Sequence, residues 1–134
     1  MPTCRRLLSL KQGLNPSEHI ALGRALAPLR DEASFVASGI TFHNLRAFRD
    51  PRALPYSEAF DGWLREVMNR RFEERNRGLA EWLGAPGARV AHPREEHLLP
   101  LMVASGAAGE DTATLAFNGT FGGARLSAYH FGVG

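Results

Sequence analysis

Apolar residues recur along the chain with the spacing of amphipathic helices and short strands. Asn15 followed by Pro16 is a helix start signal, with Asn15 as the N-cap, and that helix is predicted to run to about Leu29. Its buried stripe is expected to consist of three leucines with helical spacing: Leu22, Leu26 and Leu29. A second helix, from Ser57, is predicted to continue into the charged run 70–77, whose side chains are expected to face solvent.

Four segments have the pattern of strands. Residues 6–10 form a candidate short strand, and 34–40 is an apolar run that ends in Gly-Ile, the pattern of a buried strand that stops at a loop. Segments 112–118 and 125–131 predict a hairpin, joined through the glycine-bearing connection 119–123. The order of elements predicts an α/β fold with a central mixed sheet flanked by helices and a C-terminal β-hairpin.

Two further helices are predicted before the hairpin. A short one lies around 79–83 and ends at a loop rich in glycine and proline. The other begins at His92–Pro93 and ends at Gly106. Pro100 is expected to kink this helix or to delay its regular part.

Composition narrows the class of protein. With 134 residues, 44% of them hydrophobic, residues 1–134 are expected to form a single domain with a core. The net charge of +2 does not indicate a nucleic-acid partner, and no apolar run approaches a membrane span or a signal-peptide core. The single cysteine, Cys4, cannot form an internal disulfide, so we expect it to be a small buried residue in a cytoplasmic protein.

Five histidines are the candidates for metal binding or acid–base chemistry, because imidazole is a common metal ligand and titrates near neutral pH. His19 lies in the first predicted helix and is expected to be a surface or half-buried residue. His130 lies in the last predicted strand and is expected to pack. His43 directly follows segment 34–40, at the strand end where open α/β sheets form their ligand crevice.

His92 and His97 do not have the spacing of a zinc-protease helix. The HExxH motif places its histidines four apart, whereas these are five apart, about 140° around a helix, and Pro93 follows the first. The inverted HxxEH motif fails as well, because one residue too many separates His92 from Glu96. Spacing alone leaves both histidines open as ligands or as water-facing residues.

Four ordered segments resemble the DODA-type extradiol aromatic ring-opening dioxygenases, a class III family of the LigB-like superfamily. They are LSLKQGLNP (8–16), LGRALAPLRDE (22–32), SGITFHNLR (38–46) and HPREEHLLPL (92–101). The resemblance implies the C-terminal half of the family's fold, and the N-terminal half, which carries two metal-binding histidines, has no counterpart in these residues. Two places depart from the family pattern: Cys4-Arg5-Arg6 replaces an apolar strand, and Arg94-Glu95 replaces a Thr-Pro pair.

The same resemblance implies roles for individual residues. His97 corresponds to the third metal ligand of the DODA branch, and His43 to the histidine that handles protons at the substrate. Glu95 and Glu96 are lesser candidate ligands, because the protocatechuate branch completes its metal site with a glutamate.

Three more residues are expected to support the site. His92 is expected to fix the loop, with a direct role as the alternative. Asn44 and Arg46 are candidates for orienting His43 or an acidic group of the substrate.

The implied reaction is cleavage of a catechol-type ring beside its two hydroxyls by O₂, with Fe(II), or Zn(II), as the metal. Because the residues supply one expected ligand, the isolated chain is expected to be inactive. A partner chain that supplies the missing half, or self-association into a homo-oligomer, is expected to cover the exposed strand edges. The alternative is a non-catalytic half that acts as an interaction or oligomerisation module. A zinc hydrolase is a third hypothesis, which no Ser or Cys nucleophile motif supports.

Overall fold

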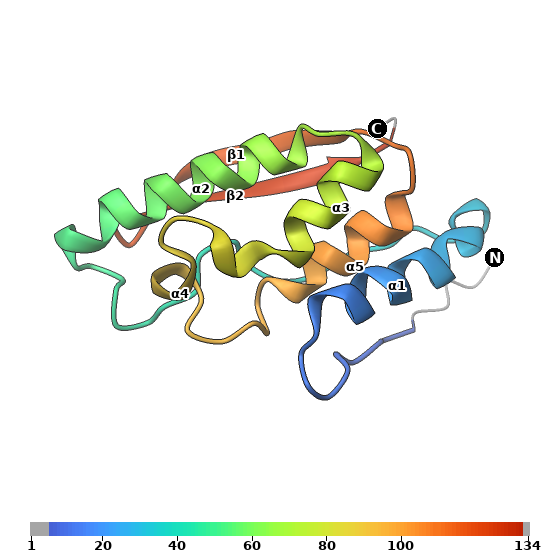
Figure 1. Cartoon of the computed structure of the whole chain (residues 1–134), viewed down its shortest axis with the longest axis horizontal. Coiled ribbons are helices and arrows are strands. Elements are labelled where there is room, and N and C mark those ends of the chain that lie inside the picture. Colours follow the sequence, from blue (N-terminus) through green and yellow to red (C-terminus); the bar gives the residue numbers. More distant parts are fainter. Residues whose placement is uncertain (1–5, 133–134) are drawn as a thin grey trace.

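The computed structural model describes residues 6–132, so the expectations for Cys4 lie outside the described residues. Helices and loops make up the described chain up to a C-terminal hairpin (Figure 1). The elements are α1 (Pro16–Leu26), η1 (Ala27–Asp31), η2 (Pro51–Ala53), α2 (Leu54–Met68), α3 (Phe72–Ala80), η3 (Trp82–Gly84), α4 (Ala88–Ala91), α5 (Leu99–Ala108), β1 (Ala113–Phe121) and β2 (Ala124–Phe131). Among these residues no helix is both long enough and apolar enough to cross a membrane.

Helix α1 begins as predicted but buries a different face. The Asn15 side chain accepts a 3.1 Å hydrogen bond from the backbone N–H of Glu18, which confirms the N-cap. The predicted leucine stripe is wrong: Leu22 and Leu26 are half-buried, and Leu29 lies in η1 with 47% of its surface exposed. The buried positions are His19, Ile20 and Gly23.

Two glycines explain this choice of face. Helices α1 and α5 lie side by side (Figure 1), and their backbones touch at Gly23 and Gly106. A Cβ on Gly23 would lie 2.1 Å from the carbonyl oxygen of Val103, and one on Gly106 would lie 2.1 Å from that of Ile20. The absence of side chains at the crossing, rather than leucine spacing, therefore sets the orientation of α1.

The predicted long helix from Ser57 is divided in two. Helix α2 ends at Met68 and α3 begins at Phe72, so the charged run 70–77 spans the junction. The expectation that this whole run faces solvent is wrong for Arg75, which is 1% exposed. The helix predicted around 79–83 is also displaced, because Leu79 belongs to α3 and only the short η3 follows.

Helix α5 begins later than predicted. Residues 93–98 form bends and turns, and Pro100 lies in the first turn of α5, so this proline delays the helix instead of kinking it. The helix passes through Gly106, the predicted stop, and ends at Ala108, followed by Gly109, whose φ of +57° suits glycine.

The C-terminal hairpin confirms the prediction, with longer strands and a tighter turn. Strands β1 and β2 pair antiparallel from Ala113↔Phe131 to Phe121↔Ala124, with an irregularity between Leu115 and Phe117. The turn is Gly122–Gly123, not the five-residue connection, and both glycines have positive φ as a type I′ turn requires. Helix α2 lies along the hairpin (Figure 1).

The α/β class with a C-terminal hairpin is confirmed, but two predicted strands do not form. Within residues 6–132 the sheet has two strands, β1 and β2. Residues 6–10 and 34–40 are irregular, and 34–39 are exposed instead of buried. A strand forms by pairing its backbone with a neighbour, and the described residues offer neither segment one.

Candidate functional site

The two histidines singled out by the resemblance lie against each other. The rings of His43 and His97 are stacked, with 3.6 Å between their centroids and 20° between their planes. His43 lies in the loop that follows segment 34–40, and His97 lies in the turns that precede α5. Both residues are half-buried.

Backbone hydrogen bonds hold these two loops together. The N–H of Ile40 donates to the carbonyl oxygen of His97 at 3.0 Å, and the N–H of His43 donates to that of Ala91 at 2.8 Å. Gly39 allows the approach, because a Cβ there would lie 2.5 Å from the His97 carbonyl oxygen. The positions of both rings are therefore set by main chain, not by contacts of the rings alone.

His92 braces the same junction from inside. Its side chain is fully buried, between the edges of Phe60 and Trp82, and its Nε2 lies 2.8 Å from the carbonyl oxygen of Thr41. A carbonyl only accepts, so Nε2 carries the hydrogen, and the buried Nδ1 has no partner among the described residues. Burial lowers the pKa of His92 to about 4, against the raising effect of the Thr41 hydrogen bond. A fully enclosed imidazole whose Nε2 is bonded to backbone suits a structural role better than metal binding.

The two glutamates beside His97 are engaged with arginines. Glu95 Oε1 lies 2.7 Å from Arg89 Nη2, and Glu96 Oε1 lies 2.8 Å from Arg94 Nε. Among the residues that the structure describes, no three His, Cys, Asp or Glu side chains are grouped so that they could hold one metal ion. Neither glutamate therefore completes a site with His43 and His97 here.

The Asn44 side chain is bonded to backbone on both of its polar atoms. Asn44 Nδ2 donates to the carbonyl oxygen of Val90 at 2.8 Å, and its Oδ1 accepts from the N–H of Arg46 at 3.1 Å. Arg46 is exposed. The Asn44 side chain thus stabilises the loop, and in the described residues no hydrogen bond joins its amide to the ring of His43.

A buried network missed by the sequence analysis ties the site to the hairpin. Thr41 Oγ1 accepts from the N–H of Ser127 at 2.9 Å and donates to its carbonyl oxygen at 3.3 Å. The Ser127 hydroxyl donates to Asp61, which also accepts from Asn118 Nδ2 at 2.8 Å and Arg65 Nε at 3.0 Å. An aspartate on the apolar face of α2, directly after Phe60, was the signal in the sequence.

The remaining histidines differ from expectation. His19 is fully buried, not at the surface: its Nε2 accepts from the N–H of Lys11 at 3.1 Å, and its Nδ1 lies 2.6 Å from the carbonyl oxygen of Asn15. Both ring nitrogens are used, so His19 is structural. His130 is exposed on β2 instead of packed.

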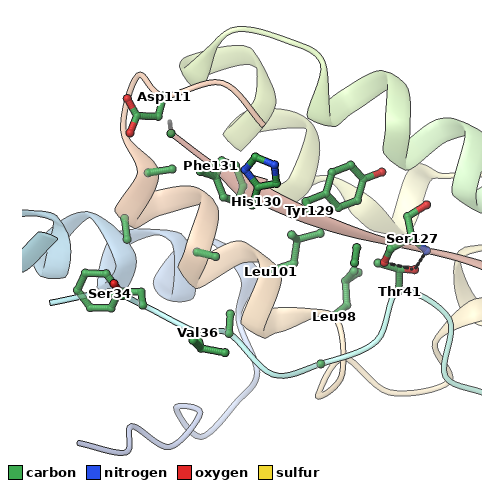
Figure 2. Close-up of a pocket in the computed structure, with 18 of the residues that line it drawn as sticks. Ser34, Val36, Thr41, Leu98, Leu101, Asp111, Ser127, Tyr129, His130 and Phe131 are labelled. Atoms are coloured by element: carbon green, nitrogen blue, oxygen red, sulfur yellow. Dashed lines mark hydrogen bonds between the residues drawn. The ribbon is translucent and has the colours of Figure 1, made fainter. Parts of the chain in front are cut away.

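An open pocket of about 580 Å³ lies beside His97. Its walls are segment 33–41 and strand β2, and its floor is α5 (Figure 2). His97 lines the pocket, together with apolar side chains that include Leu98 and Leu101. The pocket is therefore lined in part by His97, the candidate metal ligand.

Comparison with known proteins identifies the family. Residues 8–132 match the family described as the catalytic LigB subunit of aromatic ring-opening dioxygenase. The chain belongs to this family. It is 39% identical over 128 residues to a 4,5-DOPA dioxygenase extradiol of Beta vulgaris, covering 92% of this chain and 46% of that protein. It is 40% identical over 116 residues to the protein of the same name from Portulaca grandiflora, covering 82% of this chain and 41% of the relative.

A solved structure shares the fold of the chain. The crystal structure of an uncharacterized protein of Escherichia coli K12 superposes with a TM-score of 0.73 and 29% identity, over 85% of this chain and 49% of that one. The chain thus spans about half the length of the proteins it matches.

Proposed function

We propose that these residues form part of the active site of an extradiol dioxygenase that opens catechol-type rings, with His97 as one metal ligand and His43 as the acid–base residue. The stacked pair of His43 and His97 carries the proposal, because two loops far apart in sequence are fastened together to produce it. Family membership supplies the reaction class. The single cysteine, Cys4, supports a cytoplasmic site of action.

The described residues can supply part of a metal site but not a complete one. Imidazole suits both Fe(II) and Zn(II), and His97 offers one such donor at the pocket wall. A non-haem divalent metal, when bound, supplies a centre at which a chelated catechol and O₂ meet. Its other ligands have to come from residues outside 6–132, in keeping with relatives twice as long.

His43 contributes proton transfer in this proposal. A neutral imidazole can accept the proton of a substrate hydroxyl and return it later as an acid. Both atoms of O₂ enter the product as the ring C–C bond breaks, so the reaction needs no external reductant. The hydrogen bond from the His43 N–H to the Ala91 carbonyl oxygen fixes the loop so that the imidazole lies beside His97, the proposed metal ligand.

Oxygen uptake tests the proposal. The 134-residue chain is assayed with anaerobically added Fe(II) on catechol, protocatechuate and 3,4-dihydroxyphenylalanine, alone and with the part of the Beta vulgaris relative that the match does not cover. We expect no uptake from the chain alone and uptake from the pair, or from a covalent fusion of the two. Turnover by the chain alone would show a complete site in these residues. A folded fusion that neither holds metal nor consumes O₂ would favour the interaction-module hypothesis.

A further inference from the structure

Strand β2 has one edge that pairs with β1, and its other edge is bonded to side chains at Arg125 and Ser127 and is free beyond them. On the free edge, the N–H and carbonyl of Ser127 bond to the Thr41 side chain. Between 128 and 131, no backbone hydrogen bond in the described part of the chain leads to any segment other than β1. A free strand edge is a template for pairing with another strand.

Segment 34–39 lacks pairing as well. Its flanks are fixed, since the N–H of Ala33 bonds to Leu29 and that of Ile40 to His97. Between them, within residues 6–132, no backbone group of 34–39 makes a hydrogen bond to other backbone. Val36 is 92% exposed and Phe35 39% exposed. A segment with Phe35 and Val36, residue types favoured in strands, and with unbonded backbone has the properties of a strand without its neighbour.

These two unpaired segments face a common slot. They meet at Thr41 and Ser127 and diverge from there toward Ser34 and Phe131, with α5 beneath them (Figure 2). The space between them is the pocket of about 580 Å³, and its floor includes Leu101 and other apolar residues of α5. Backbone donors and acceptors on both walls with an apolar floor match the needs of a β-strand better than those of a small polar ligand.

We propose that this slot receives a β-strand from the half of the family fold that lies outside these residues, paired with segment 34–39 and with the free edge of β2. The inference rests on the proposed function, and relatives about twice the length of the matched region supply the occupant. His97 lines the same slot, so a polypeptide that fills it is brought beside the candidate ligand. One docking event would then complete both the sheet and the site.

Hydrogen exchange read by mass spectrometry tests the docking without an activity readout. The probe is the part of the Beta vulgaris relative outside the match. In the chain alone, amides of 34–39 are expected to exchange rapidly, because they are unbonded. In the complex we expect at least tenfold slower exchange there and in 128–131. Protection confined to the outer edge of β1 would overturn the proposal.

A proline at Val36 separates backbone pairing from side-chain contact. Val36→Pro removes one N–H from a segment that makes no backbone bond in this structure, so the fold is expected to persist. Val36→Thr keeps the N–H and is the matched control. Val36→Pro is expected to weaken binding at least tenfold, and Val36→Thr less than threefold. Equal binding by the two variants would overturn the proposal.

The remaining outcomes separate this inference from the proposed function. Protection of 34–39 without oxygen uptake would support the docking and contradict the dioxygenase role. Oxygen uptake without protection of 34–39 would support the dioxygenase role and contradict the docking. If the two polypeptides do not associate, the covalent fusion is measured instead, and rapid exchange at 34–39 in the folded fusion overturns the docking. If the chain instead forms a concentration-dependent dimer in which 34–39 is protected, the slot is filled by a second copy. That result would also overturn the proposed docking.

Discussion

Nε2 of His92 donates a hydrogen bond of 2.8 Å to the carbonyl oxygen of Thr41, two positions before His43. Both partners are buried, so water does not compete for the bond. It joins the turn that leads to His97 with the loop that carries His43. The alignment of the two stacked histidines therefore depends on a third histidine that touches solvent at neither nitrogen.

This brace predicts a specific loss of stability in mild acid. The pKa of His92 is lowered by burial from 6.5 to about 4, so below pH 6.5 the unfolded chain binds a proton that the folded chain does not. Stability from His92 is thus complete above about pH 6.5 and declines as the pH falls toward 4, by about 3 kcal/mol in total. Urea unfolding at pH 7 and pH 4.5 measures the loss.

A substitution isolates the contribution of His92. His92→Gln retains an N–H donor for the Thr41 carbonyl but does not titrate, so its stability is expected to change less between the two pH values. His130→Gln, at an exposed histidine, is the control and should behave like the parent. An identical pH dependence in His92→Gln and the parent would refute the assignment.

His43→Phe separates proton transfer from metal binding. Phenylalanine can still stack on His97 but cannot carry a proton, so metal content should stay near normal in the fusion with the complementing half. Turnover is expected to fall by about 10²- to 10⁴-fold, the usual contribution of an acid–base residue. Metal analysis and oxygen uptake on the same sample distinguish the two roles. Loss of metal along with activity would place His43 among the metal ligands.

His97→Ala is expected to reduce the metal content of the same fusion. The contact of His97 with Ile40 uses the backbone carbonyl, so the loop junction is expected to survive truncation of the ring. His130→Ala removes an exposed imidazole from the neighbouring strand and should leave the metal content unchanged. If His97→Ala binds metal with the stoichiometry and affinity of the parent, His97 is not a ligand.

Local signals in the sequence predicted the elements whose causes are local. The Asn15 cap depends on a side chain and an N–H three residues apart, and the hairpin depends on adjacent glycines with positive φ. Segment 34–40 has the composition of a strand, yet it is irregular because a strand needs a partner, and none lies within the described residues.

Motif resemblance, and not spacing, singled out the two histidines that the structure brings together. Nothing in the positions of His43 and His97 in the sequence indicates that their rings stack. The bonds that bring them together use main-chain atoms of Ile40 and Ala91, which side-chain patterns do not reveal. Burial of Arg75 was missed for a similar reason, because its acceptors are chiefly carbonyl oxygens at the end of α5.

Arg75→Lys tests how much the hydrogen bonds of the buried Arg75 guanidinium contribute to stability. Its guanidinium donates to the hydroxyl and carbonyl of Ser105 and to the carbonyls of Gly109 and Asp111, at 2.8 to 3.1 Å. A lysine ammonium cannot span these acceptors, so unfolding free energy is expected to fall by about 2–4 kcal/mol. Arg77→Lys, at an exposed position two residues along α3, should change it by less than about 0.5 kcal/mol. Equal effects of the two substitutions in urea unfolding would contradict the role of Arg75 at the end of α5.

The crossing of α1 and α5 predicts opposite effects for the same substitution in two helices. Gly106→Ala places a methyl 2.1 Å from the carbonyl oxygen of Ile20, and the obstacle is backbone that cannot rotate away, so the helices must separate. We expect a loss of at least about 1–3 kcal/mol in the free energy of unfolding. Gly62→Ala in α2 meets nothing within 4 Å, so it should gain up to about 1 kcal/mol, because alanine is the better helix former. Thermal unfolding of both variants beside the parent measures the contrast. A Gly106→Ala variant as stable as the parent would show that the two backbones do not touch.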